Sequence, residues 1–231
     1  FVSGDKISAI GNFPDKGADD VLDGHGAYLA PGFIDVNTDS DHYLSILDYP
    51  EQEDFLRQGV TTIAGGMCGS SLAPLIYGSL ESVQKWGDVA KVNVDWHTMN
   101  EFLSVLDRKK LALNFLTLIG HSTIRRAVVG EEIRTLTKNE LLVLENVLKK
   151  ALRGGGFGFS TGLSYVHSCK TPYSELKFFA GVVKKENNGV YATHIRDNGV
   201  NLLKSVDETI KLAEETGVKV LISHLLPIKR Y

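Results

Sequence analysis

The sequence predicts an α/β protein built around a parallel sheet. Short runs rich in β-branched and aromatic residues alternate with stretches of helical periodicity, and glycine or polar residues separate them. Of the 231 residues, 43% are hydrophobic and 23% are charged, which is typical of a folded globular protein. A chain of this length can bury a large core, so we expect one large domain or two smaller ones.

The first thirty residues differ from the alternating series that follows them. Residues 2–10 and 21–29 are expected to form two short strands of a small antiparallel sheet. Proline and glycine at positions 31 and 32 favour a boundary there. We therefore expect a small domain at residues 1–30 and a larger one at residues 31–231.

The larger domain contains six predicted core strands and two clear amphipathic helices between them. The strands are expected at residues 32–36, 60–65, 111–119, 157–161, 190–194 and 218–224. The helices are expected at residues 138–152 and 202–216, where leucine and valine recur at helical spacing. Six βα units fit either an open doubly wound sheet or most of a (β/α)8 barrel, which needs eight strands.

Three residues with metal-ligand chemistry follow separate predicted strands. Cys68 comes after the second strand, His194 ends the fifth and His224 ends the sixth. The carboxyl ends of parallel strands meet at one mouth, where active sites are built. A thiolate and two imidazoles predict a zinc site with a fourth position open to water, as catalytic zinc sites have. The alternative for each residue alone is a small buried cysteine or a hydrogen-bonded histidine.

Composition excludes several other classes of function. The net charge is 25 − 28 = −3, so we expect no nucleic-acid partner. The sequence has no run of 18 apolar residues, so we expect no membrane span. Two cysteines are too few for a disulfide framework and favour reduced thiols or a ligand.

Six runs of residues resemble the N-acyl-D-amino-acid deacylases, or D-aminoacylases, a branch of the amidohydrolase superfamily. The runs are LAPGFIDV (29–36), GVTT (59–62), CGSSLAPL (68–75), GFSTGLSY (158–165), THIRD (193–197) and ISHL (222–225). They occur in the family's order and cover essentially the whole chain. The cysteine run is specific to this branch, because most relatives in the superfamily have no cysteine ligand at that point.

This resemblance implies a fold and a reaction. The expected fold is a metal-dependent TIM barrel, of which this chain holds about six βα units, with part of a small β-sandwich in residues 1–30. The expected reaction is zinc-dependent hydrolysis of the amide bond of small-molecule N-acyl-D-amino acids. The family's zinc ligands match Cys68, His194 and His224, and a family tyrosine that contacts the substrate carboxylate matches Tyr165. The resemblance also implies a cytoplasmic protein.

The chain departs from the family at the first barrel strand. The superfamily has His-x-His there, whereas this chain has Asn37 and Asp39 around Thr38. Amide oxygen is a poor zinc ligand and carboxylate favours a harder cation, so either the second metal position is lost or Asp39 serves it. His42 is expected to be a solvent-facing loop residue, with replacement of a missing ligand as the alternative.

Two further departures concern substrate binding and catalysis. Leu226 stands where many relatives have a lysine that meets the substrate carboxylate, so Arg196 or Lys229 is expected to provide that contact. Arg196 could equally be the partner in a structural ion pair. The resemblance places the general-base aspartate after the eighth barrel strand, which lies beyond Tyr231.

Two alternative functions are consistent with these departures. The first is a catalytically impaired or inactive relative that keeps the barrel for a structural or binding role, favoured by Asn37, Asp39 and Leu226. The second is a cyclic amidohydrolase of the hydantoinase type, against which the cysteine run argues. The sequence leaves open the acyl group, the amino acid, the number of metals and the oligomeric state.

Overall fold

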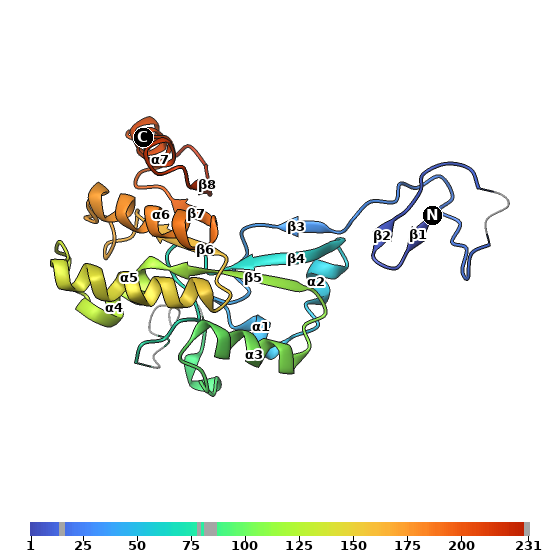
Figure 1. The fold of residues 1–231 in the computed structure, drawn as a ribbon, viewed down its shortest axis with the longest axis horizontal. Helices are drawn as coiled ribbons and strands as arrows, with labels where there is room; N and C mark the ends of the chain where they lie inside the picture. Colours follow the sequence, from blue (N-terminus) through green and yellow to red (C-terminus); the bar gives the residue numbers. More distant parts are fainter. Residues whose placement is uncertain (14–16, 78–79, 81–86, 229–231) are drawn as a thin grey trace. The chain divides into compact units, whose positions relative to one another are not determined.

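The structure is a computed structural model that describes residues 1–13, 17–77, 80 and 87–228. The chain divides into two compact units, Phe1–Pro31 and Gly32–Tyr231. Figure 1 labels the elements of both units in chain order.

The first unit contains a two-stranded antiparallel sheet. Strands β1 (Val2–Ser3) and β2 (Lys6–Ile7) pair across a turn in which Gly4 has a φ of 59°. The predicted strand at residues 2–10 is therefore a hairpin rather than one strand.

The prediction of a strand at residues 21–29 was wrong. The structure assigns these residues to no strand, and Ala27 N–H donates to the Gly24 carbonyl in a turn. Val21, Leu22 and Tyr28 are all more than four-fifths exposed. An apolar alternation becomes a strand only where a neighbouring strand accepts its backbone hydrogen bonds, and this segment has no such neighbour among the described residues.

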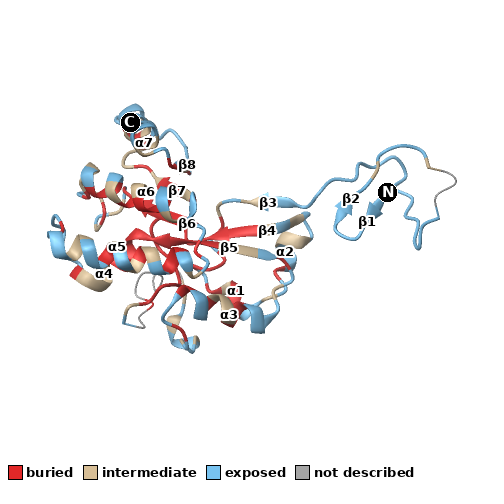
Figure 2. Cartoon of the chain, in the orientation of Figure 1, coloured by how far each residue is buried: buried red, intermediate tan, exposed pale blue. Residues whose placement is uncertain are grey.

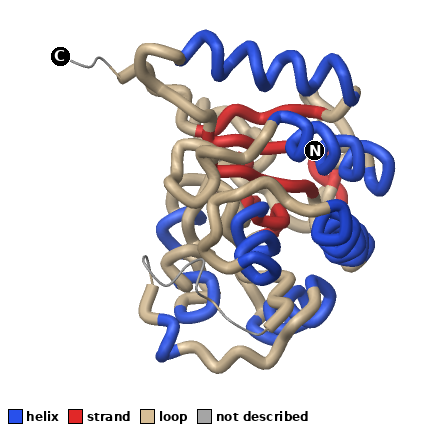
Figure 3. The backbone as a smooth tube through the Cα atoms, turned by 90° about the vertical axis from the view of Figure 1, so that its left-hand side faces the viewer, coloured by secondary structure: helices blue, strands red, loops and turns tan. Residues whose placement is uncertain are grey.

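The second unit is built on one parallel sheet, which confirms the predicted fold class. The strand order is β3-β4-β5-β6-β7-β8, so each strand pairs with the next one in the chain. The sheet curls into part of a (β/α)8 barrel, with helices lying around the strands (Figure 3). The strands are β3 (Phe33–Asp35), β4 (Val60–Gly65), β5 (Asn114–Gly120), β6 (Gly158–Gly162), β7 (Val190–His194) and β8 (Lys219–Ser223).

The helices alternate with these strands. They are α1 (Ser45–Asp48), α2 (Glu53–Leu56), α3 (Met99–Lys109), α4 (His121–Val129), α5 (Lys138–Arg153), α6 (Tyr173–Asn187) and α7 (Leu202–Thr216), with a 3-10 turn η1 at Val89–Lys91. The predicted helix at 202–216 is confirmed as α7, and the one at 138–152 extends by one residue in α5. The predicted strand at 111–119 begins later, because Ala112 N–H donates to the Pro50 carbonyl instead of to a sheet partner.

Burial is concentrated on the strands and on the helix faces that cover them (Figure 2). In α5, for example, Leu144, Leu148 and Leu152 are buried at helical spacing while Leu142 is half exposed. A small second cluster, formed by Met67, Cys68, Leu118 and Ala192 and flanked by Tyr165 and Leu221, gathers residues from several strands and their carboxyl-terminal loops. The predicted metal ligand Cys68 is thus packed among apolar side chains.

Among the described residues, no helix is both long and apolar enough to span a membrane.

Candidate metal centre

The three predicted metal ligands lie at the carboxyl ends of three strands. Cys68 lies three residues after β4, His194 is the last residue of β7, and His224 directly follows β8. Strands β7 and β8 pair in register with His194 opposite Ser223, so the two histidines emerge at the same level of the sheet. The parallel topology thus brings residues far apart in sequence to one mouth.

The loop after β4 bends sharply to present the Cys68 thiol. Gly66, Cys68 and Gly69 have positive φ angles of 71°, 53° and 82°. A Cβ at Gly66 would lie 2.1 Å from the Leu118 carbonyl oxygen, so both the backbone and the neighbouring strand require glycine there. Cys68 is not a glycine, and its left-handed conformation costs about 1 kcal/mol. Such strain is typical of residues held for function.

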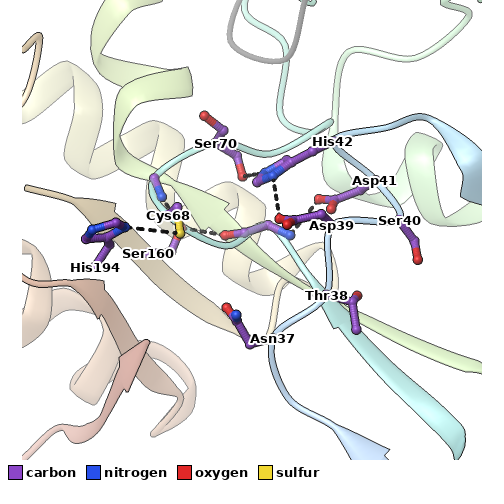
Figure 4. Close-up of polar contacts among 12 residues, drawn as sticks. Asn37, Thr38, Asp39, Ser40, Asp41, His42, Cys68, Ser70, Ser160 and His194 are labelled. Atoms are coloured by element: carbon purple, nitrogen blue, oxygen red, sulfur yellow. Dashed lines mark hydrogen bonds and ion pairs between the residues drawn. The ribbon is translucent and has the colours of Figure 1, made fainter. Parts of the chain in front are cut away.

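The potential ligand atoms converge. Cys68 Sγ lies 3.2 Å from His224 Nε2 and 3.8 Å from His194 Nδ1. All three ligand atoms lie within 4.8 Å of one another, and this is the one such group of three among the described residues. The two imidazole rings lie edge to face, with an angle of 61° between their planes and centroids 5.3 Å apart. Figure 4 shows Cys68 beside His194, close to the residues that follow β3.

The donor set fits zinc in chemistry and in spacing. Thiolate and imidazole are the ligands that zinc prefers, with bonds of about 2.3 Å to sulfur and about 2.0–2.1 Å to nitrogen. Those bonds at a tetrahedral angle separate sulfur from nitrogen by about 3.6 Å, between the two sulfur–nitrogen distances of Cys68. Three protein ligands leave one tetrahedral position for water or substrate, as in catalytic rather than structural zinc sites.

Electrostatics around the three residues favour metal binding. Burial and the charge of His224 lower the pKa of His194, which keeps its imidazole in the neutral form that can bind a metal. Burial raises the pKa of Tyr165, and the charge and hydrogen bond of Cys68 raise it further. The Tyr165 ring lies 5.4 Å from that of His194. Because its pKa is raised, the Tyr165 hydroxyl stays protonated at neutral pH and can donate a hydrogen bond.

Of the residues after β3, Asn37 contacts His224, whereas Asp39 pairs with His42. The Asn37 amide nitrogen lies 3.5 Å from both ring nitrogens of His224, and the Asn37 amide oxygen is buried without a hydrogen-bond partner among the described residues. Asp39, whose side chain is 51% exposed, contacts His42 Nδ1 through its Oδ1 at 3.0 Å. Asp39 therefore faces His42, and it does not belong to the group of three ligand atoms.

The expectation that His42 faces solvent was wrong. Its side chain is 1% exposed, and its second nitrogen, Nε2, lies 3.1 Å from the Ser70 carbonyl oxygen (Figure 4). The Asp39 carboxylate and the Ser70 carbonyl can only accept hydrogen bonds, so both ring nitrogens donate and the ring is an imidazolium. Sequence reasoning missed this burial because Ser70 is 28 residues away in the chain.

The pKa values of this group reflect the same contacts. Burial by itself would lower the pKa of His42, but the charge of Asp41 and the hydrogen bond to Asp39 outweigh it, and the pKa rises to about 9. The hydrogen bond from His42 lowers the pKa of Asp39. Burial raises the pKa of Asp41, whose Oδ2 accepts from Gly66 N–H at 2.6 Å. Asp39 and His42 are thus a matched pair of charges.

Arg196 lines a cleft of about 760 Å³ that also borders His194 and Asn198. Its guanidinium donates to both carboxylate oxygens of Glu208 and to the carbonyls of Cys169 and Thr171. These contacts fit the structural ion pair that the sequence left open. A direct contact between Arg196 and substrate stays a prediction.

Two other residues from the sequence analysis, Leu226 and Lys229, follow β8 in the chain. Leu226 is largely exposed, and Lys229 lies outside the described residues. His121 is fully buried and contacts Glu175 through Nε2 at 2.8 Å, so it belongs to the packing between α4 and α6.

Comparison with known proteins gives the same family that the sequence runs suggested. The chain is 33% identical to a D-aminoacylase from Alcaligenes xylosoxydans xylosoxydans over 96% of its own length and 45% of that protein. It therefore spans less than half the length of this curated relative. The scan against family models found no match.

Solved structures agree with the sequence comparison. One is a D-aminoacylase studied for its binuclear metal centre, described as showing one-metal activation and second-metal attenuation. It has a TM-score of 0.74 and 32% identity, with 84% of this chain and 40% of that chain covered. Another is an N-acyl-D-glutamate deacylase from Bordetella bronchiseptica in complex with zinc and a phosphonate inhibitor. It has a TM-score of 0.72 and 28% identity, with 82% of this chain and 39% of that chain covered.

Proposed function

Because the chain is related in sequence and in fold to the D-aminoacylases and N-acyl-D-amino-acid deacylases, we propose that the protein carrying it is a zinc-dependent amidohydrolase. Its substrates are small N-acyl-D-amino acids, and its products are a carboxylate and a free D-amino acid. The observation that carries the proposal is the convergence of Cys68, His194 and His224 within 4.8 Å at three strand ends.

Each part of the reaction is assigned to a group that suits it. Zinc bound by these three residues supplies Lewis-acid chemistry, since it polarises a carbonyl and lowers the pKa of water to about 7. His194 and His224 would hold the ion, and the Cys68 thiolate would hold it as well and reduce its charge. The family resemblance assigns the general base to an aspartate beyond Tyr231, so the described residues bind and orient rather than accept the proton.

Tyr165 is assigned to substrate binding. Its ring packs beside His194 and its hydroxyl reaches Cys68, so it lies at the edge of the ligand group. Because its pKa is raised, the hydroxyl remains a hydrogen-bond donor throughout the neutral range and can bind a substrate carboxylate. Arg196 is assigned to the wall of the adjoining cleft, where Glu208 holds it.

Two further assignments concern the cellular location and residues 1–30. The thiolate of Cys68 must stay reduced to bind zinc, which supports a cytoplasmic location. The antiparallel pair of β1 and β2 supports the assignment of residues 1–30 to a small β-sandwich.

Steady-state hydrolysis by the zinc-loaded, full-length protein tests the proposal. A panel of N-acetyl-D-amino acids is compared with the matching L enantiomers and with a hydantoin. We expect release of the free amino acid from D substrates only. Zinc bound without turnover of any substrate would support a non-catalytic relative, and ring opening of the hydantoin would support the cyclic amidohydrolase.

A further inference from the structure

The residues after β3 do not fit a second cation of the kind that a binuclear centre needs. Asn37 offers only a neutral amide, and its nitrogen, not its oxygen, faces His224. The remaining donor, Asp39, has its Oδ1 3.0 Å from His42 Nδ1. A second cation would therefore have to use a carboxylate that already has a cationic partner.

We propose that this protein holds a single divalent cation, and that the salt bridge between Asp39 and His42 occupies the place of a second one. This inference rests on the proposed function, because it takes the Cys68 group as the first site. The imidazolium of His42 supplies, from within the chain, the positive charge that a second metal would bring to Asp39.

Displacing His42 would be unfavourable for two reasons. First, its side chain is 1% exposed, so an imidazolium that lost Asp39 would be a buried charge with one hydrogen bond fewer. Second, the ring is held from its other side by the Ser70 carbonyl at 3.1 Å, so it has little freedom to move away. A cation that approached Asp39 would therefore meet a fixed positive charge at short range.

Asp41 also stabilises the charged form of His42. It is 1% exposed and its Oδ2 is bound to Gly66 N–H, on the loop that presents Cys68. Its charge contributes to the raised pKa of His42. Asp39, Asp41 and His42 thus link the loop after β3 to the loop after β4. The charged form of His42 therefore stabilises the folded structure.

Metal stoichiometry of the full-length protein tests the proposal. Metal-free protein is titrated with Co²⁺ in a calorimeter, which records every bound equivalent, and bound metal is measured independently by elemental analysis after equilibrium dialysis. We expect saturation at one equivalent. Two equivalents in the unaltered protein would overturn the single-cation inference alone, whereas zero equivalents would remove the proposed metal centre itself.

Substitution of His42 tests the role of the salt bridge. His42→Gln keeps an amide donor for the Ser70 carbonyl but removes the charge beside Asp39. We expect this variant to bind a second equivalent of Co²⁺, more weakly than the first. The affinity for this second equivalent should be at least about tenfold higher than in the unaltered protein. The double variant His42→Gln, Asp39→Asn should return to one equivalent, because it lacks the freed carboxylate.

Two controls keep the result interpretable. His25→Asn removes a histidine from an exposed pair with Asp23 and should leave the stoichiometry at one. Circular dichroism confirms that each variant is folded. A folded His42→Gln variant that still binds one equivalent would overturn the role of the salt bridge. If that variant does not fold, His42→Asn, which also replaces the charged ring by a neutral amide, decides instead: a second equivalent supports the role of the salt bridge, and a single equivalent overturns it.

Discussion

The carboxyl ends of β4, β7 and β8 differ from the carboxyl end of β3 in what their polar side chains contact. At the first region, a thiol and two imidazoles face one another within 4.8 Å. At the second, the Asp39 carboxylate faces the His42 imidazolium at 3.0 Å. Three electron-pair donors that converge can share one cation, whereas the carboxylate of an ion pair is already neutralised by its partner. The partners of a histidine, more than its presence near a strand end, therefore decide whether it can bind a metal.

Removing the thiol gives the largest expected effect on this comparison. Structural zinc sites bind with about 10–16 kcal/mol over four ligands, or about 2.5–4 kcal/mol for each, so the loss of one should weaken zinc binding roughly 100- to 1000-fold. We expect Cys68→Ala to abolish both stoichiometric zinc and hydrolysis. Elemental analysis of the purified variant measures the first.

The matched control for this variant is Cys169→Ala. Cys169 donates its thiol to the Val166 carbonyl and is not part of the ligand group, so its loss should leave zinc unchanged. Normal zinc content in Cys68→Ala would assign the metal to other residues.

The second region should make stability depend on pH. The pKa of His42 rises to about 9 in the folded protein, against about 6.5 in an unfolded chain. Folding therefore favours the charged form, and its contribution is complete below pH 6.5 and is lost as the pH rises toward 9. The free energy of unfolding should fall by up to about 3 kcal/mol over this range.

Urea denaturation of metal-free protein at several pH values between 6 and 9 measures this decrease. His42→Gln lacks the titrating ring and should show a much flatter dependence. Parallel curves for the two proteins would mean that His42 is not charged when folded.

A smaller effect is expected at the edge of the first region, where Tyr165 lies beside His194 and Cys68. Tyr165→Phe removes a donor whose hydrogen bond to a charged group is worth about 1.5 kcal/mol, so kcat/KM for a D substrate should fall about tenfold. Zinc content should not change. Tyr173→Phe is the control, because Tyr173 donates to Glu215 at the surface. An equal loss in both variants would exclude a specific role for Tyr165.

The parallel sheet and the ligand group could be predicted because both follow from local patterns. Alternation of strands and helices indicates a parallel sheet, and its topology brings Cys68, His194 and His224 to one edge whatever the details of packing. The helix at Leu202–Thr216 was predictable for the same reason, since its periodicity lies within one segment and Gly217, with a φ of 68°, ends it.

The rest depended on partners that are distant in sequence. Residues 21–29 have the composition of a strand, but no strand among the described residues lies beside them to accept hydrogen bonds. His42 is buried because the Ser70 carbonyl and the carboxylates of Asp39 and Asp41 surround it. Arg196 is bound to Glu208 and to two carbonyls, one of them 27 residues away. No local pattern specifies such contacts.

X-ray absorption at the zinc edge tests most directly whether a thiolate and two imidazoles share one metal ion. For the full-length protein with one equivalent of zinc, we expect one sulfur at about 2.3 Å and nitrogen or oxygen ligands at about 2.0–2.1 Å, with the sulfur absent in Cys68→Ala. A spectrum with only nitrogen and oxygen neighbours would contradict the proposed centre.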